Sequence, residues 1–200
     1  RLDDAEDAFS DLIRQDRQDA EALAGLGIVE IRRADFGEAV DLLRRAVRLG
    51  SENRDDFKLA LQSAEFGLDL QRVRGAIDAG DYESAKTLVV EMSPHSARDR
   101  AQIASVKAEI SAARGDVLAA ETSYREALSF NPKDEFAFAG LLNVLVSNDD
   151  VEGLQEVLGQ YASIRPESST AKASVAKARG WLAEQRDDSM TAIDPVSYTH

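Results

Sequence analysis

Residues of similar type recur along the chain at intervals of 34 positions. Two stretches show the recurrence at several positions at once, and the repeated residues are small, apolar or proline. The aligned sets are Ala5, Phe9 and Leu12 with Ala39, Leu43 and Ala46, and Ala120, Tyr124, Ala127 and Pro132 with Leu154, Leu158, Tyr161 and Pro166. A fixed period of this size is typical of repeat proteins, in which each repeat is one supersecondary unit stacked on its neighbours. A generic helical bundle has no reason to reuse one interval, so the period favours a repeat array.

The composition indicates that the repeated unit is helical. Only 4 residues are proline, whereas Ala, Leu, Glu and Arg, which lose little conformational freedom in a helix, are frequent. No stretch shows the alternation of apolar and polar residues that marks a half-buried strand. We therefore expect helical hairpins, the first of them with its turn at 35–37.

The charge balance restricts the partners. Lys and Arg number 24 against 37 Asp and Glu, which gives a formal net charge of -13. Binding to a phosphate backbone requires clustered Lys and Arg, so we expect no nucleic-acid partner. Cysteine is absent from the sequence, which excludes disulfides and thiolate sites. No run approaches the ~18 to 20 consecutive apolar residues of a transmembrane helix, so we expect no membrane insertion by this segment.

The repeated pattern resembles the tetratricopeptide repeat (TPR), a helical hairpin with small residues at close helix contacts and a proline near its end. The matching residues are Gly27, Ala39, Leu43 and Ala46 in 20–53, and Ala120, Tyr124, Ala127 and Pro132 in 101–134. Glu30 and Ser111 depart from the consensus, which has tyrosine there. The resemblance covers residues 1 to about 184. It implies an all-α fold, a right-handed α-solenoid of helix-turn-helix repeats.

The stretch 54–79 interrupts the period. Ala39 and Ala85 stand at equivalent places in successive second helices but are 46 residues apart, an excess of 12. The stretch has no proline and keeps apolar residues at spacings of three and four, which predicts one extended helix ending at Gly80. A repeat followed by such a helix resembles the periplasmic TPR region of the C protein of bacterial cellulose synthase. In that family the region precedes an outer-membrane barrel and is thought to guide the exported glucan.

The period also predicts where the repeats divide. The expected segments are a second helix of a partial repeat at 1–19, repeats at 20–53, 54–99, 101–134 and 135–168, a terminal helix at 169–185 and a disordered tail at 186–200. We expect the sequence to begin inside a repeat. The last six residues resemble a translated adapter sequence, so we expect the tail to be partly non-native.

No motif predicts catalysis, a metal site or a cofactor. His95 lies in an inter-repeat turn without a Ser or Asp partner at a recognisable spacing, and His200 lies in the tail. Gly27 lacks the neighbours of a dinucleotide fingerprint and is better explained by close helix packing. Acidic pairs fall near expected helix starts, turns or the tail, where carboxylates cap helices, favour the positive end of the helix dipole or are solvated. These pairs are Asp3-Asp4, Asp55-Asp56, Asp149-Asp150 and Asp187-Asp188.

The TPR resemblance implies which side chains line the concave surface, because fixed positions of each first helix face it in that family. The candidate groove contacts are Gln102, Ser105, Glu109, Phe136 and Asn143. Phe138 falls on the packing side of the same helix, and Trp181 is expected to pack rather than bind. The carboxylate clamp of the chaperone-binding members is absent, because no cation stands at its lysine position in the three repeats compared.

Two functions are consistent with these features. The first is a non-enzymatic TPR scaffold of the bacterial cellulose synthase complex, periplasmic, with protein subunits and a neutral polysaccharide (glucan) as partners and a parent protein anchored in the outer membrane. The second is a cytoplasmic adaptor that binds a peptide or helix in its concave groove. Neither requires a cofactor.

Overall fold

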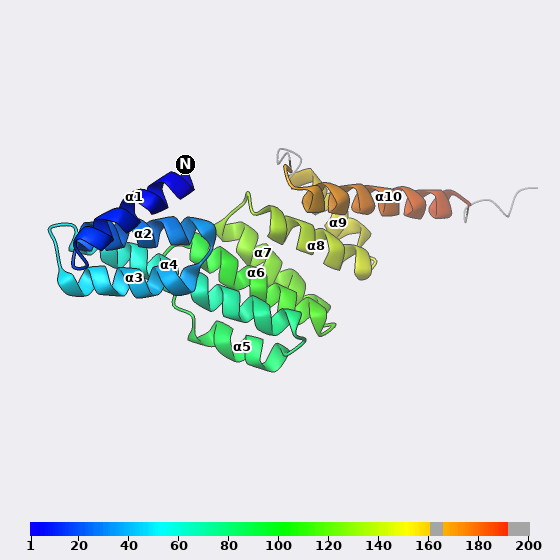
Figure 1. Ribbon diagram of the computed structural model, residues 1–200. Coiled ribbons are helices and arrows are strands. Elements are labelled where there is room, and N and C mark those ends of the chain that lie inside the picture. The colour runs from blue at the N-terminus through cyan, green and yellow to red at the C-terminus, as the bar shows by residue number, and fades with distance from the viewer. Residues whose placement is uncertain (161–165, 192–200) are drawn as a thin grey trace, which may run out of the picture. The chain divides into compact units, whose positions relative to one another are not determined.

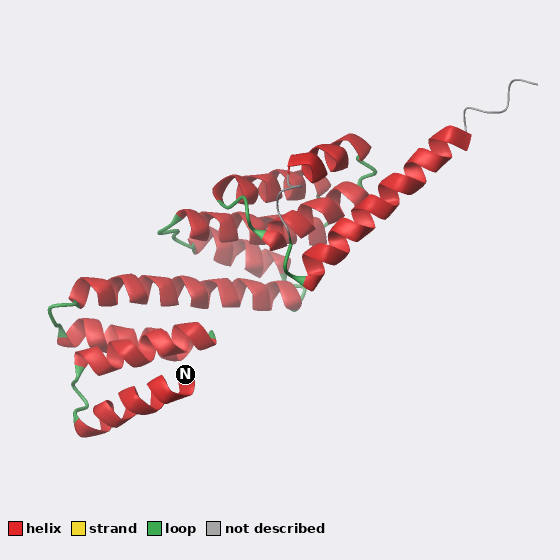
Figure 2. Cartoon of the chain, turned by 90° about the horizontal axis from the view of Figure 1, so that it is seen from above, coloured by secondary structure: helices red, strands yellow, loops and turns green. Residues whose placement is uncertain are grey.

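The fold is all-helical. The computed structural model describes residues 1–160 and 166–191, with side chains described as far as residue 185. The described residues form ten helices and no strand (Figures 1 and 2), which confirms the expected all-α class. Among these residues no helix combines the length and apolar character needed to cross a membrane. The chain divides into two compact units, Arg1–His95 and Ser96–His200.

The first unit contains five helices that pack in the order of the sequence. They are α1 (Leu2–Gln15), α2 (Ala20–Arg33), α3 (Phe36–Leu49), α4 (Arg54–Asp78) and α5 (Tyr82–Glu91). Each helix contacts the next, and α2 also contacts α4. Buried side chains of α2, α3 and α4 form the core, among them Leu23, Leu43 and Phe57. Helix α1 has no buried residue and joins this core through the partly buried Phe9 and Ile13.

The described residues of the second unit also form five helices. They are α6 (Ala97–Ala113), α7 (Val117–Phe130), α8 (Glu135–Ser147), α9 (Val151–Gln160) and α10 (Ser169–Thr191). Helix α8 contacts α6, α7, α9 and α10 and is therefore the central element of the unit. Phe138 is 1% exposed in its core, and the partly buried Trp181 packs against the same core, as expected for both.

The helix starts repeat the 34-residue period of the sequence. Four pairs of helices begin 34 residues apart: α1 and α3, α2 and α4, α7 and α9, and α8 and α10. Helices α3 and α5 begin 46 residues apart, because α4 is the extended helix and has 25 residues. The predicted extended helix is thus confirmed. The right-handed sense of the solenoid stays a prediction.

Aspartate residues cap the starts of five helices. Asp19, Asp35, Asp81, Asp116 and Asp134 each accept a backbone N–H from the first turn of the helix that follows. Gly80 and Gly115 adopt positive φ angles of 75° and 77° just after α4 and α6, a conformation that glycine adopts without steric cost. The helix end predicted at Gly80 is confirmed.

Two helix ends and one helix cap differ from the expected ones. Helix α6 begins at Ala97 rather than near 101, because Ser96 and Asp99 form a capping box. Helix α4 begins after Asn53, which makes no side-chain cap, so neither Asp55 nor Asp56 has the predicted capping role. Helix α10 continues to Thr191, beyond the predicted end at 185. The rest of the expected tail, 192–200, lies outside the described residues.

Glycines allow close approach between consecutive helices. A Cβ atom at Gly27 would lie 2.7 Å from the Leu43 side chain, which confirms the packing role predicted for this glycine. Aromatic rings cover three other glycines: Phe9 covers Gly25, Phe36 covers Gly67 and Tyr124 covers Gly140, each within 2.4 Å of where a Cβ atom would stand. The two units thus share one packing device, a ring from a second helix seated on a glycine of the next first helix.

Candidate functional site

A groove of about 620 Å³ lies within the second unit, between α8 and α10. Its lining residues are Asn143, Ser169, Thr170, Ala173, Ser174 and Lys177. The Asn143 Nδ2 atom donates a hydrogen bond to the Ser174 Oγ atom over 3.3 Å. The groove therefore joins an amide from α8 to hydroxyl groups and one ammonium group from α10.

The start of α10 is held against α8 by Glu135, the first residue of α8. Its carboxylate accepts the backbone N–H groups of Glu167 at 2.6 Å and Ser168 at 2.8 Å. These hydrogen bonds to Glu167 and Ser168 lower the pKa of Glu135. A carboxylate at the start of one first helix thereby holds the segment that leads into the next first helix.

The predicted contact residues divide by exposure. Asn143 lines the groove. Phe136 is 46% exposed and stands seven residues before Asn143, so the two side chains share one face of α8. Gln102 and Glu109 are half-buried on α6. Ser105 is 4% exposed and its hydroxyl has no hydrogen-bond partner among the described residues. Burial therefore removes Ser105 from the set of groove contacts.

Glu109 lies close enough to Tyr124, the residue of α7 whose ring packs on α8, for its charge to act on that side chain. Burial, with a smaller contribution from the Glu109 charge, raises the pKa of Tyr124 to about 12. The Tyr124 ring is 4% exposed and covers Gly140. Glu109 thus lies near the packing contact between α7 and α8 in addition to its predicted place on the groove face.

Sequence reasoning missed the α10 side of the groove. Thr170, Ala173 and Lys177 stand 34 residues after Phe136, Ala139 and Asn143, the corresponding positions on α8. Extending the period by one more repeat would have identified them. The prediction that Trp181 packs against a neighbour concerns a different part of the terminal helix and gives no indication of a groove beside α8.

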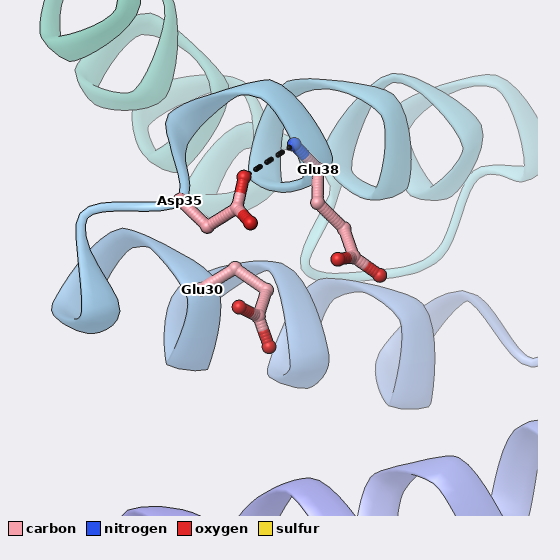
Figure 3. Close-up of side chains that lie close together, drawn as sticks. All are labelled: Glu30, Asp35 and Glu38. Carbon is pink, nitrogen blue, oxygen red and sulfur yellow. Dashed lines mark hydrogen bonds between the residues drawn. The ribbon is translucent and has the colours of Figure 1, made fainter.

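Three carboxylates meet at the turn between α2 and α3 (Figure 3). One oxygen atom from each of Glu30, Asp35 and Glu38 lies within 4.8 Å of the others. The acidic pairs of the sequence do not predict this cluster, because its members are not adjacent along the chain. Asp35 Oδ1 accepts the Glu38 backbone N–H at 3.2 Å, so this carboxylate acts as the cap of α3.

Glu30 is the buried member of the cluster. It is 5% exposed and lies 3.8 Å from the Arg33 guanidinium, which also pairs with Asp3 and Glu6 of α1. Burial, followed by repulsion from Glu38, raises the pKa of Glu30, and Arg33 opposes the shift. Capping of α3 accounts for Asp35, and the ion-pair network around Arg33, which joins α1 to α2, accounts for Glu30.

Comparison with known proteins points to one group of relatives. No protein-family model matches the chain. It is 34% identical over 146 residues to cellulose synthase operon protein C of Xanthomonas axonopodis pv. citri (strain 306), covering 72% of this chain and 9% of that protein. It is 28% identical over 170 residues to cellulose synthase 1 operon protein C of Komagataeibacter xylinus, covering 82% of this chain and 12% of that protein.

Two further similarities extend the comparison. The cellulose synthase operon protein C of Pseudomonas fluorescens (strain SBW25) is 27% identical over 195 residues, covering 94% of this chain and 15% of that protein. The chain therefore spans between 9% and 15% of the length of these relatives. Among solved structures, YrrB, a TPR protein with an unusual peptide-binding site, matches with a TM-score of 0.42 and 20% identity, covering 86% of this chain and 82% of that chain.

Proposed function

We propose that this chain, a TPR-type protein that resembles a segment of cellulose synthase operon protein C, is an interaction scaffold of a bacterial cellulose synthase complex. The observation that carries the proposal is the similarity to these relatives over 72% to 94% of the chain. In this role it acts in the periplasm, where it assists assembly of the complex and export of the glucan. It contributes binding surfaces and no catalysis.

The groove between α8 and α10 is the proposed contact surface. It offers an amide at Asn143, hydroxyl groups at Thr170 and Ser174 and an ammonium group at Lys177. Amide and hydroxyl groups both donate and accept hydrogen bonds, so they suit a neutral polar ligand or the backbone of a partner protein. The exposed Phe136 ring on the same face of α8 adds an apolar platform. Gln102 and Glu109 extend the proposed contacts onto α6.

Site-specific photo-crosslinking in the bacterium that encodes the chain tests this proposal. A photoreactive amino acid replaces Phe136 in the intact parent protein, and the crosslinked products are identified by mass spectrometry. The matched control replaces Leu118, which is 73% exposed on α7 and lies outside the groove. We expect products with other cellulose synthase proteins or with glucan from position 136, and fewer from position 118.

The same experiment distinguishes the two functions considered from the sequence. Crosslinks from position 136 to cytoplasmic proteins alone would contradict the periplasmic scaffold and support the cytoplasmic adaptor. Equal yields from both positions would contradict the role of the groove.

A further inference from the structure

Helix α1 has an apolar side that no other described helix covers. Helix α3, which occupies the same place one period later, contacts both α2 and α4, whereas α1 contacts α2 alone among the described helices. Three residues of α3 are 0% exposed, and their counterparts 34 positions earlier in α1 are half-buried or exposed. The buried residues are Ala39, Leu43 and Ala46, and the counterparts are Ala5, Phe9 and Leu12. Leu12 is 44% exposed, so this side of α1 has room for another helix.

Helix α10 has the complementary gap, because the place of a second helix beside it is open among the described residues. In α2 this side is covered by α3, since a Cβ atom at Gly27 would lie 2.7 Å from the Leu43 side chain. The corresponding residues of α8 are at most 1% exposed, whereas those of α10 are all exposed. They are Phe138, Leu142 and Leu145 in α8 and Lys172, Ala176 and Arg179 in α10. The buried Ala171 and Ala178 lie on another side of α10.

The two uncovered sides carry opposite charges. Helix α1 has five carboxylates and one guanidinium, whereas α10 has three cations and one carboxylate over 169–185. Asp4 and Asp11 border the apolar side of α1 and are seven residues apart, which is about two helical turns. Lys172 and Arg179 have the same spacing on the uncovered side of α10. Opposite charges at matched spacing favour contact between these two sides and oppose contact of either side with itself.

Three of these four charges already have a partner on the exposed surface. The Asp4 carboxylate lies 3.4 Å from the N-terminal amine, and Asp11 pairs with Arg14, one turn away on the same helix. The Lys172 Nζ atom donates a hydrogen bond to the Glu167 backbone carbonyl at 2.9 Å. Ion pairs between exposed groups contribute little to stability, so these partners do not compete strongly with a partner helix.

The register of a repeat brings the matched charges together. Helices α2 and α3 are separated by only two residues and therefore run antiparallel. If α1 lay beside α10 as α3 lies beside α2, Phe9 would meet Ala176, whose small side chain allows a close approach. The antiparallel course then directs the two aspartates of α1 toward the two cations of α10. The resulting pairs are Asp11 with Lys172 and Asp4 with Arg179.

We propose that α1 of one copy of this chain fills the place of a second helix beside α10 of another copy, so that copies join head to tail. The contact uses two different surfaces and is therefore heterologous, which leads to a ring if the rotation closes and to a filament if it does not. The partner is a second copy because each copy carries both surfaces. The inference goes beyond the proposed function and does not depend on the cellulose synthase complex.

Sedimentation velocity of the full 200-residue chain tests the inference. We expect the mean sedimentation coefficient to rise with concentration between about 1 µM and 1 mM, and to rise less at high salt, which screens exposed charges. Far-UV circular dichroism and the Trp181 fluorescence transition establish that each variant is folded.

Two charge-reversal variants identify the surfaces. Asp4→Lys, Asp11→Lys reverses α1, and Lys172→Glu, Arg179→Glu reverses α10. Each variant alone brings like charges together and should associate at least about tenfold more weakly than the wild type. An equimolar mixture of the two should regain association, because the reversed α1 of one variant then matches the reversed α10 of the other.

The matched control Lys86→Glu, Lys107→Glu makes the same change of charge at exposed positions of α5 and α6 and should associate as the wild type does. If Lys172→Glu unfolds α10, Asp4→Lys and Arg179→Glu repeat the mixing experiment with one pair.

The mixture separates this contact from general stickiness of apolar surfaces, which charge reversal on both partners does not restore. Regained association in the mixture, with weak association of each variant alone, supports the inference. A wild type that sediments as a monomer at every concentration overturns it. So does a variant that associates alone as the wild type does, or a mixture that stays monomeric. Photo-crosslinking at 118 and 136 then still decides the scaffold function separately.

Discussion

Helices α2 and α8 occupy the same place in their repeats but bury different chemistry. Gly25 of α2 and Gly140 of α8 both lie under an aromatic ring from the preceding helix. The residue five positions after each glycine is buried: it is Glu30 in α2, which is 5% exposed, and Leu145 in α8, which is 0% exposed. A carboxylate in the first unit thus stands where the second unit has a core leucine.

The difference shows how a repeat tolerates a polar residue at a core position. Arg33 lies next to Glu30 and also pairs with Asp3 and Glu6, so the first unit connects α1 to α2 partly through charge. The second unit depends on apolar packing around Phe138. A buried carboxylate is costly without a paired cation, which explains why the ion-pair network accompanies Glu30.

The largest expected effect concerns the apolar core of the second unit. Phe138→Ala should lower the free energy of unfolding of this unit by about 3–5 kcal/mol, because it removes a buried ring and leaves a cavity. Trp181 is the only tryptophan and packs on this core, so its fluorescence during denaturant unfolding reports on the second unit.

Leu23→Ala is the matched change in the first unit, where Leu23 is 0% exposed. This substitution should lower the free energy of unfolding of the first unit by about 2–5 kcal/mol and reduce the hydrogen-exchange protection of α2. It should leave the Trp181 transition in place. A similar shift of the Trp181 transition in both variants would contradict separate cores.

Alanine at the glycines should have effects of opposite sign within each unit. At Gly140 a Cβ atom would stand 2.3 Å from the buried Tyr124 ring, so Gly140→Ala should destabilise by about 1–3 kcal/mol. At Gly180 no atom lies within 4 Å, so Gly180→Ala should stabilise α10 by about 0.5–1 kcal/mol. Thermal unfolding of both variants measures the difference.

Gly67 and Gly75 of α4 repeat this test in the first unit. A Cβ atom at Gly67 would stand 2.4 Å from the Phe36 ring, whereas Gly75 has open space. If Gly67→Ala stabilised the protein as much as Gly75→Ala, ring packing on glycine would not be a shared device.

The smallest expected effect is a pH dependence of opposite sign in the two units. The pKa of Glu30 is raised above 4.5, mainly by burial, so the folded first unit binds this proton at a higher pH than the unfolded chain. The charged Glu30 side chain lowers the free energy of unfolding of the first unit, and this loss disappears as the pH falls through the raised pKa toward 4.5. Glu30→Gln should remove this dependence and stabilise the first unit at neutral pH, as measured by hydrogen exchange of α2.

Glu135 behaves in the opposite way. Its pKa is lowered below 4.5 by the backbone N–H groups of Glu167 and Ser168. The stabilising contribution of Glu135 to the free energy of unfolding is therefore present above pH 4.5. It is lost as the pH falls through the lowered pKa of Glu135. Denaturant unfolding followed by Trp181 fluorescence should show this loss in the wild type and not in Glu135→Gln. The same acid response in both proteins would show that Glu135 does not hold α10.

Much of the fold could be predicted from the sequence because it depends on local spacing. The 34-residue period predicted the helical hairpins, and the 46-residue interval predicted the long α4. The resemblance to the TPR family separated the buried Phe138 from the exposed Phe136. The candidate site was predicted only in part. Asn143 lines the groove, whereas Ser105 is buried, because burial depends on which neighbouring helix covers a face.

The sequence by itself determined the periodicity, the helices and the inward face of each helix, since a helix of 3.6 residues per turn converts spacing into direction. Only the tertiary structure decided which faces meet. It brought Asn143 of α8 next to Ser174 of α10, placed Arg33 of α2 against Asp3 and Glu6 of α1, and placed Arg44, Arg72 and Glu91 around one groove. Most of these residues come from different helices, and the distance between helices is set by packing that no local pattern records.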